Sequence, residues 1–556
     1  MRIALFAVTD AGRRAAAEVA PALGGRVHAL DELSALWPDL DGAVFFLATG
    51  ATVRLVAPLL TDKHTDPGVV CVDEARRFAV ALTGGHEGGA NALATRVAAL
   101  LDAEPVITTA SDAVGRTGLD ELAELLDAEI DGDAAAAGTA LLDGAARVQN
   151  PLGFPLPAIP VPTTEPRHTI TISDRAAPGT APGWTVLVPR CLVVGIGSER
   201  GAPASAVAET LRRVETEHGF DLRAVRAVAS VDLKADEAGI LAAIAPHELR
   251  TYPAEVLARV EVPNPSEVVR AEVGTASVAE AAALQAAADF GGGELVVEKI
   301  KGAGVTVAVA RVRPRGRLAI VGLGPGAADL RVPRAETELR RASVVVGLDQ
   351  YVEQVRHLLR PGTEVRASGL GEEEQRAADA VALAGKGYAV ALIGSGDAGV
   401  YAMASPALEG AGADIDVVGV PGVTAALSAS SLLGAPLGHD HVLISLSNLH
   451  TPWSVIEKRV AAAAAADLVT CFYNPRSRDR HWQLGAALAA FRAHRPGSTP
   501  VGAVRQAGRP GQRVWTAPLD EFDPAEVDML TTVVVGSSTT RMVAGRMVTP
   551  RGYRWS

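Results

Sequence analysis

The chain has 556 residues, of which 48% are hydrophobic and 21% are charged, and its formal net charge is −12 at pH 7. At about 100–200 residues per domain this length predicts several domains, and the negative charge argues against nucleic-acid binding through phosphate neutralisation. No apolar run approaches the roughly 20 residues that span a bilayer, and the three cysteines are too far apart to suggest a metal site. We therefore expect a cytoplasmic protein with no metal, nucleic-acid or membrane partner.

Short apolar runs alternate with helical patterns at the start of the chain. Residues 2–8 are predicted to form a strand rather than a signal peptide, because polar Thr9 and Asp10 follow directly. Further strands are expected at 43–48, 69–73, 79–83 and 105–112, with helices at 12–22, 53–60 and up to residue 101. This alternation predicts an α/β domain with a parallel sheet and right-handed crossovers.

A glycine-rich turn at residues 84–89 contains His86 and Glu87. Glycine loses much chain entropy on folding, so a run of glycines suggests that backbone must come close to something. His86 titrates near neutrality and is a candidate general base, while Glu87 and Asn91 are candidates for orienting water or substrate. The alternative is a tight strand–helix turn with an incidental histidine.

This first block resembles the N-terminal domain of cobalt-precorrin-5A hydrolase, a corrin-pathway family. The resemblance is carried by residues 51–63, 66–74, 85–91 and 105–110. It implies opening of a ring lactone with loss of acetaldehyde. The family usually has Ser where Gly84 stands, which removes a hydroxyl beside the proposed site.

Residues 119–188 differ in composition from the blocks on either side. Five prolines fall between residues 155 and 166, and residues 169–172 alternate Thr and Ile before Ser173. We expect a loose connector with one short hairpin at 169–173. The hydrolase family has a middle domain here, and this version is expected to be shortened.

A second α/β block is predicted from 189 to 313. It begins with a strand at 192–197 and a helix at 204–217. Residues 225–234, 262–269, 273–282 and 295–301 resemble the C-terminal domain of the same hydrolase family. Ser198 and Glu199 stand where Cys-Arg is expected, and loss of the arginine puts binding of an acidic ligand at this turn in doubt.

The last block opens with the strand and turn of residues 318–326. The spacing Gly322, Gly324, Ala327 fits a loose dinucleotide fingerprint, and Asp349 follows the next apolar run. However, Pro325 inside the turn does not suit a nucleotide-binding helix start, so NAD is not expected.

Two further glycine-rich turns organise this block. Residues 390–401 and 417–426 each begin as an apolar run, typical of a buried parallel strand, and end in a turn. Because α/β sheets bind ligands beyond the carboxyl ends of their strands, these turns predict a ligand crevice. Asp397 supplies an acid and Thr424 a hydroxyl at that edge.

Residues 316–556 resemble precorrin-3B C(17)-methyltransferase, of the tetrapyrrole methylase family, along their whole length. The motifs lie at 321–326, 395–401, 403–405, 421–426, 433–440, 444–447, 451–453, 472–477, 535–538 and 546–553. The resemblance implies two lobes, about 316–425 and 426–556, with S-adenosylmethionine between them, and a homodimer through this domain. The residues that it implies for the cofactor are Gly322, Gly324, Pro325, Gly326, Ser395, Gly396, Asp397, Val400, Tyr401, Thr424, Ala425, Tyr473 and Asn474.

A polycarboxylate tetrapyrrole substrate needs local positive charge on a net acidic protein. Arg476, Arg478 and Arg480 follow a predicted strand, and Arg505 and Arg509 follow the next. Arginine forks match carboxylates bidentately, so these five residues are candidate substrate contacts. The alternative is a solvated basic loop.

The sequence therefore predicts a multidomain α/β protein of four parts: 1–118, 119–188, 189–313 and 316–556. The resemblances imply a fusion acting on precorrins, with C-17 methylation and ring contraction in the last part and lactone opening in the front. Two alternatives stay open. The front half could be a non-catalytic tetrapyrrole carrier, as Gly84, Ser198 and the short middle segment suggest, or the last part could methylate another corrin position.

Overall fold

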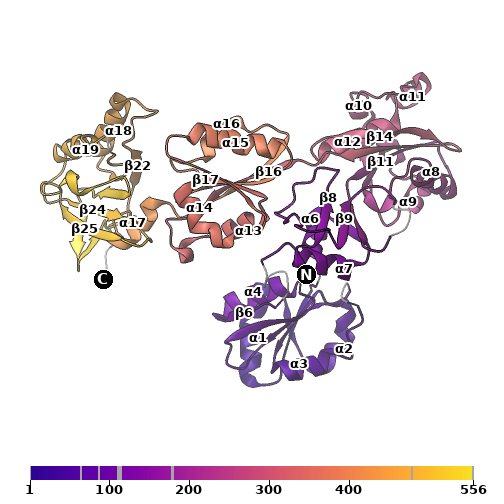
Figure 1. Ribbon diagram of the computed structural model, residues 1–556, viewed down its shortest axis with the longest axis horizontal. Helices are drawn as coiled ribbons and strands as arrows, with labels where there is room; N and C mark the ends of the chain where they lie inside the picture. The colour runs from indigo at the N-terminus through magenta and orange to yellow at the C-terminus, as the bar shows by residue number, and fades with distance from the viewer. Residues whose placement is uncertain are drawn as a thin grey trace. The chain divides into compact units, whose positions relative to one another are not determined.

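The computed structural model describes residues 2–62, 65–85, 88–108, 115–176, 181–477 and 480–553 (Figure 1). The chain divides into two compact units, one of residues 1–152 and 159–313, the other of residues 153–158 and 314–556. Helices and strands are mixed throughout both units, which confirms the predicted α/β class. Within the described ranges, no helix is both long and apolar enough to cross a membrane.

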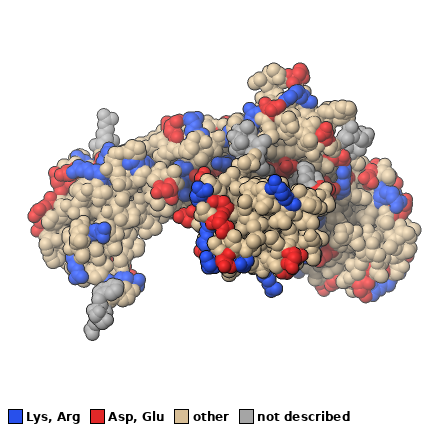
Figure 2. Space-filling view, turned by 90° about the horizontal axis from the view of Figure 1, so that it is seen from below, with Lys and Arg blue, Asp and Glu red and all other residues tan. Residues whose placement is uncertain are grey.

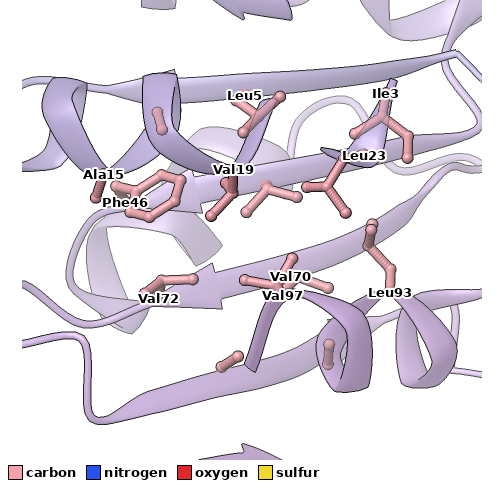
Figure 3. Close-up of a cluster of buried hydrophobic side chains, with 14 of the residues drawn as sticks. Ile3, Leu5, Ala15, Val19, Leu23, Phe46, Val70, Val72, Leu93 and Val97 are labelled. Carbon is pink, nitrogen blue, oxygen red and sulfur yellow. The ribbon is translucent and has the colours of Figure 1, made fainter. Parts of the chain in front are cut away.

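The first sheet has six strands in the order β2-β1-β3-β4-β5-β6. Helices α1 and α4 pack their apolar side chains onto one face of it, where Leu5, Val19, Val70 and Val97 meet in a buried cluster (Figure 3). The strands are β1 (Ile3–Ala7), β2 (Arg26–His28), β3 (Gly42–Phe46), β4 (Gly68–Val72), β5 (Phe78–Thr83) and β6 (Glu104–Val106). The helices are α1 (Asp10–Leu23), α2 (Leu33–Leu36), α3 (Thr49–Val56) and α4 (Ala90–Leu101).

The prediction of a wholly parallel first sheet is wrong at β5, which pairs antiparallel with β4. The connection from Val72 to Phe78 is a short turn with Arg76 at φ 56°, and so short a link joins antiparallel neighbours only. As a result Thr83 pairs with Val69, near the start of β4. Gly84 and Gly85, which follow β5, therefore lie at the sheet edge opposite the loops that follow β1 and β3.

Residues 119–188 are not the loose connector that composition suggested. They contain a four-stranded sheet of order β7-β10-β9-β8, in which β9 pairs parallel with both neighbours instead of forming a hairpin. The strands are β7 (Ala128–Gly132), β8 (Ala146–Gln149), β9 (His168–Ile172) and β10 (Trp184–Pro189), with helices α6 (Leu119–Leu126) and α7 (Ala134–Asp143). The proline-rich stretch is only the long connection between β8 and β9.

The third sheet has the order β13-β12-β11-β15-β14. Helix α12 is buried against it, so closely that a Cβ on Gly195 would lie 1.9 Å from the carbonyl oxygen of Ala279. The strands are β11 (Leu192–Ser198), β12 (Val225–Val231), β13 (Leu249–Tyr252), β14 (Gly293–Lys301) and β15 (Val305–Val312). The helices are α8 (Ala204–Thr216), α9 (Ala238–Ile244), α10 (Ala254–Leu257), α11 (Glu267–Val273) and α12 (Val278–Asp289).

The second unit begins with a five-stranded parallel sheet of order β18-β17-β19-β16-β20. We call this part the N-lobe. Because β19 and β20 flank β16, the turns after these three strands meet at one edge. The strands are β16 (Gly316–Gly322), β17 (Val344–Leu348), β18 (Glu364–Ser368), β19 (Ala389–Gly394) and β20 (Ile415–Val420). The helices are α13 (Pro333–Arg341), α14 (Asp349–Val355), α15 (Glu373–Gly385) and α16 (Ala404–Gly410).

The remainder of this unit, the C-lobe, holds a mixed sheet of order β22-β23-β26-β24-β25 and a small sheet of order β21-β28-β27. Figure 2 draws one face of the whole molecule, and acidic and basic side chains are interspersed over that face. The strands are β21 (Gly434–Ala435), β22 (His441–Ser445), β23 (Val469–Tyr473), β24 (Pro500–Arg505), β25 (Arg513–Pro518), β26 (Thr531–Val535), β27 (Arg541–Val543) and β28 (Arg546–Val548). The helices are α17 (Ala425–Leu433), α18 (Trp453–Ala465) and α19 (Gln483–Arg492).

Candidate functional site

A cavity of about 280 Å³ lies at the carboxyl ends of the N-lobe strands. Its wall comes from the turn after β16, the segment 394–403 after β19, the start of α17, and C-lobe residues near the ends of β23, β24 and β26. The residues expected at the cofactor that line it are Pro325, Ser395, Gly396, Asp397, Val400, Tyr401, Thr424, Ala425, Tyr473 and Asn474. This is the sheet edge at which α/β folds bind ligands.

Glycines bring the turns of this edge together. A Cβ on Gly322 would lie 2.8 Å from both Gly396 O and Gly422 N, and one on Gly422 would lie 2.1 Å from Gly396 O. Gly324 and Gly396 also exchange backbone hydrogen bonds, Gly324 N to Gly396 O at 3.0 Å and the reverse at 2.7 Å. Gly322, Gly324 and Gly326 do not line the cavity themselves. Their small size lets the lining turns approach one another.

Asp397 ties two of these turns together. One carboxylate oxygen accepts from Gly399 N at 2.8 Å, and the other accepts from Gly422 N at 3.0 Å. Both contacts are charge-assisted bonds to backbone, which are stronger than neutral ones. The carboxylate therefore organises the turns after β19 and β20, in addition to lining the cavity.

Tyr473, at the end of β23, contacts the residues at the start of α17. Its phenol oxygen lies 2.6 Å from the hydroxyl of Thr424 and accepts from Ala426 N at 2.9 Å. This amide belongs to the first turn of α17, where backbone N–H groups have no partner within the helix. Burial is the main cause that raises the pKa of Tyr473, so the phenol stays protonated at neutral pH.

Tyr401 links the N-lobe to the C-lobe. Its hydroxyl donates to Leu443 O at 2.7 Å, and its ring lies 5.3 Å from that of Tyr473. The backbone of Tyr401 has φ 51°, a conformation that non-glycine residues rarely adopt. Such strain is found where the surrounding structure imposes a particular side-chain direction.

Arg509 does not have the position expected of a substrate-only contact. From the turn after β24 it donates through Nε to Pro325 O at 2.6 Å and through Nη2 to Ser395 Oγ at 2.7 Å. A Cβ on Gly326 would lie 2.5 Å from the Arg509 side chain, so this glycine makes room for it. A C-lobe arginine thus holds two of the N-lobe turns that line the cavity.

The other arginines expected to bind substrate do not line the cavity, and Arg478 lies outside the described residues. Arg476 donates to Pro524 O and Ala525 O, and Arg505 donates to Asp528 at 2.7 Å, so both are held within the C-lobe. Arg480 is 8% exposed and donates to Asn474 O at 2.8 Å.

Arg480 lies close behind the cavity wall. Its guanidinium is 3.7 Å from the sulfur of Met529, and Met529 and Asn474 both line the cavity. Desolvation lowers the pKa of Arg480, and no carboxylate among the described residues forms an ion pair with it. Its positive charge is therefore buried with neutral acceptors alone.

Several lining residues carry no signal that sequence analysis used. They are contributed by α14, α15 and the C-lobe edge, and include Gln350, Tyr351, Glu373, Arg376, Gln506 and Met529. They fall outside the glycine motifs, and only the tertiary structure brings α14, α15 and the C-lobe to the same cavity. Polar atoms of Ser395, Thr424 and Asn474 at the wall, beside the small Gly394, suit a ligand that combines polar groups with a flat ring. A Cβ on Gly394 would have Ala402 Cβ, at 4.0 Å, as its nearest neighbour, so the glycine leaves space there.

In the first unit, His86 and Glu87 lie outside the described residues. Asn91 is the second residue of α4, and its backbone N donates to Gly85 O at 3.0 Å. A Cβ on Gly68 would lie 2.1 Å from Gly88 O, so the glycine-rich turn packs against the start of β4.

Three family models match the chain. Residues 31–112 match the model described as cobalamin synthesis G N-terminal, residues 192–310 match cobalamin synthesis G C-terminus, and residues 317–523 match tetrapyrrole (corrin/porphyrin) methylases.

Among curated proteins, one from Salmonella typhimurium named "Probable cobalt-factor III C(17)-methyltransferase" is 45% identical over 242 residues, which is 42% of this chain and 99% of that protein. A cobalt-factor III methyltransferase from Priestia megaterium is 41% identical over 249 residues, 43% of this chain and 46% of its own length, so the chain spans about half of that relative. A solved structure of the methyltransferase CobJ is 35% identical, covers 42% of this chain and all of that chain, and has a TM-score of 0.40.

Proposed function

The chain belongs to the tetrapyrrole methylase family, and from this premise we propose that its second unit is a precorrin-3B C(17)-methyltransferase of cobalamin biosynthesis. The proposed reaction methylates C-17 of the tetrapyrrole with ring contraction. The observation that carries this proposal is the cavity where the turns after β16, β19 and β20 meet, because the family motifs converge on it.

S-adenosylmethionine bound in this cavity would supply a methyl group activated on a sulfonium. The residues proposed to hold it are Ser395, Asp397, Val400, Thr424 and Asn474, all of which line the cavity. The proposed set also includes Pro325, Gly396, Tyr401, Ala425 and Tyr473. Three glycines that do not line the cavity would support the turns that hold the cofactor, namely Gly322, Gly324 and Gly326. Methyl transfer is an in-line displacement, so the protein's task is to align the nucleophilic carbon and to exclude water.

The proposed substrate is a polycarboxylate, and positive charge near the cavity supports this. Arg480 and Arg509 have no ion-pair partner among the described residues, which leaves their charge available to a substrate carboxylate. Arg476 and Arg505 are held by C-lobe acceptors and are weaker candidates, and the role of Arg478 stays a prediction. A homodimer through this unit also stays a proposal, to be tested by sedimentation.

Titration calorimetry tests the cofactor assignment. Residues 314–556 form most of the second unit, but the full chain is the safer sample because residues 153–158 also belong to that unit. The full chain should bind S-adenosylhomocysteine and transfer a radiolabelled methyl group to precorrin-3B or its cobalt form. Tight binding of NAD with no binding of S-adenosylhomocysteine would refute the assignment.

For the first unit we propose lactone opening with release of acetaldehyde, supported by the matches over residues 31–112 and 192–310. His86, with Glu87 and Asn91, is the proposed catalytic group. His86→Ala should abolish acetaldehyde release and leave methylation intact, with His247→Ala as a matched control on a different domain. Unchanged release would remove His86 from the mechanism. If the wild type releases no acetaldehyde from either cobalt-containing or metal-free substrate, the carrier alternative is favoured.

A further inference from the structure

Arg376 is a buried cation on the N-lobe side of the cavity. It lies near the start of α15, is 5% exposed and lines the cavity. Its Nε donates to Ser368 Oγ at 2.9 Å and its Nη2 donates to Gly369 O at 2.6 Å. Two contacts with the end of β18 therefore fix the plane of the guanidinium.

Nothing among the described residues neutralises this charge. The third guanidinium nitrogen, Nη1, has only the sulfur of Met403 at 3.9 Å, which is a weak acceptor, and Met403 also lines the cavity. The two other strongly buried arginines of the N-lobe differ, since Arg317 pairs with Glu338 and Arg331 pairs with Glu336. Arg376 is therefore a buried charge with neutral partners at a cavity wall.

Two carboxylates share this cavity, and each has other contacts. Both oxygens of Asp397 accept from backbone N–H groups. Glu373 accepts from Gly371 N at 3.2 Å and forms no ion pair with Arg376 in the described structure. Arg509 adds a second positive charge to the wall, again with neutral acceptors. A buried unpaired charge is costly, and an anion bound in the cavity would offset that cost.

We propose that Arg376 is the anchor of a carboxylate subsite on the N-lobe wall of this cavity. The free Nη1 edge would donate to the carboxylate while the bonds to Ser368 and Gly369 hold the fork in place. This proposal rests on the function proposed above, which supplies two sources of the same chemistry. One is the amino-acid carboxylate of the methyl donor, and the other is a carboxylate side chain of the tetrapyrrole.

Two ligand pairs distinguish these sources. S-adenosylhomocysteine carries the amino-acid carboxylate and 5′-methylthioadenosine lacks it. Calorimetry with both ligands therefore measures how much the carboxylate contributes to the binding affinity. Uroporphyrin, a tetrapyrrole polycarboxylate, is titrated by fluorescence in the presence of S-adenosylhomocysteine. Each titration uses the full-length wild type, Arg376→Met, Arg376→Lys and the control Arg366→Gln. Arg366 lies on β18 of the same lobe and is an exposed arginine paired with Glu364.

If the subsite takes the carboxylate of the methyl donor, Arg376→Met should weaken the binding of S-adenosylhomocysteine about tenfold or more. The affinity for 5′-methylthioadenosine should stay unchanged. If the subsite takes a tetrapyrrole carboxylate, the same variant should weaken the binding of uroporphyrin and leave the affinities for both nucleosides unchanged. Arg376→Lys should show a smaller loss in the same direction, because lysine keeps the charge without the fork. Arg366→Gln should match the wild type.

The proposal is overturned if Arg376→Met binds all three ligands like the wild type. Thermal melting shows whether the variants fold, and if Arg376→Met does not, Arg376→Lys decides alone, with wild-type affinity for all three ligands as the refuting result. Failure of the wild type to bind S-adenosylhomocysteine would instead refute the proposed function. In that event the uroporphyrin titration, made without the nucleoside, still decides the subsite.

Discussion

The phenol oxygen of Tyr473 lies 2.6 Å from the hydroxyl of Thr424, although the two residues belong to different elements 49 positions apart. Ala426 N also donates to this phenol, at 2.9 Å. Because a backbone N–H can only donate, the phenol oxygen accepts there, and its own proton is available for Thr424. Thr424 also lines the cavity, so its hydroxyl group can contact a ligand there.

Removing the phenol hydroxyl of Tyr473 should therefore weaken the binding of S-adenosylhomocysteine. Tyr473→Phe leaves the Ala426 amide and the Thr424 hydroxyl without this partner, and an unsatisfied buried group costs about 1–3 kcal/mol. We expect the Kd of S-adenosylhomocysteine to rise about tenfold, measured by calorimetry. Tyr388→Phe, at an exposed tyrosine of the same unit, is the control and should bind normally.

Asp397 should act through the turns it holds. Asp397→Ala leaves Gly399 N and Gly422 N without their acceptor, whereas Asp397→Asn keeps one acceptor oxygen. Each charged hydrogen bond contributes about 1.5–3 kcal/mol. We expect the alanine variant to lose most of its affinity for S-adenosylhomocysteine and the asparagine variant to lose less. Equal affinities for wild type and alanine variant would show that the turns do not need the carboxylate.

Substitutions of Arg480 and Arg476 should have different effects on substrate binding. Arg480 is buried beside the cavity with no counter-ion in the part of the chain that the structure describes, and Arg476 is held by carbonyl groups of the 524–525 turn. We expect Arg480→Gln to raise the KM for the tetrapyrrole by about tenfold or more, with the affinity for S-adenosylhomocysteine near normal. Arg476→Gln should leave that KM almost unchanged. A normal KM in both variants would place the carboxylate contacts elsewhere.

The Arg505–Asp528 pair should affect stability at neutral pH more than at acid pH. Burial raises the pKa of Asp528, but hydrogen bonds from Arg505, Thr531 and Leu530 N outweigh it, and the net effect lowers the pKa below its ordinary value. A carboxyl with a depressed folded-state pKa stabilises the fold above its unfolded pKa, near about 3.9, and loses that contribution as the pH falls through the folded-state value.

Arg505→Gln should thus lower the Tm by a constant small amount between pH 5 and 8, and the gap should close below about pH 4. The side chains are 35% and 44% exposed, so the loss should stay below about 1 kcal/mol. Calorimetric melting of both proteins across this range measures it. A gap that does not depend on pH would mean that the pairing contributes nothing to the stability difference.

The sequence by itself determined the features that depend on local backbone and composition. The apolar runs of the N-lobe are strands, the glycine motifs at 322–326, 394–396 and 422 are turns at strand ends, and the α/β class holds throughout. These features were predictable because a buried strand and a tight turn each need particular residue types within a few positions. The family motifs of residues 316–556 are likewise local, so they could be identified from the sequence.

Only the tertiary structure decided how distant segments meet. The antiparallel pairing of β5 and the sheet of residues 128–189 depend on strand partners that no local pattern specifies. The same holds for Arg509, whose partners Pro325 and Ser395 lie 184 and 114 positions away in the chain. Arginine looks alike in a sequence whether it is paired, solvated or buried alone, because its partners are contributed by other elements. Arg505 and Arg476 were predicted as substrate contacts for this reason, and packing instead joins Arg505 to Asp528 and Arg476 to the 524–525 turn.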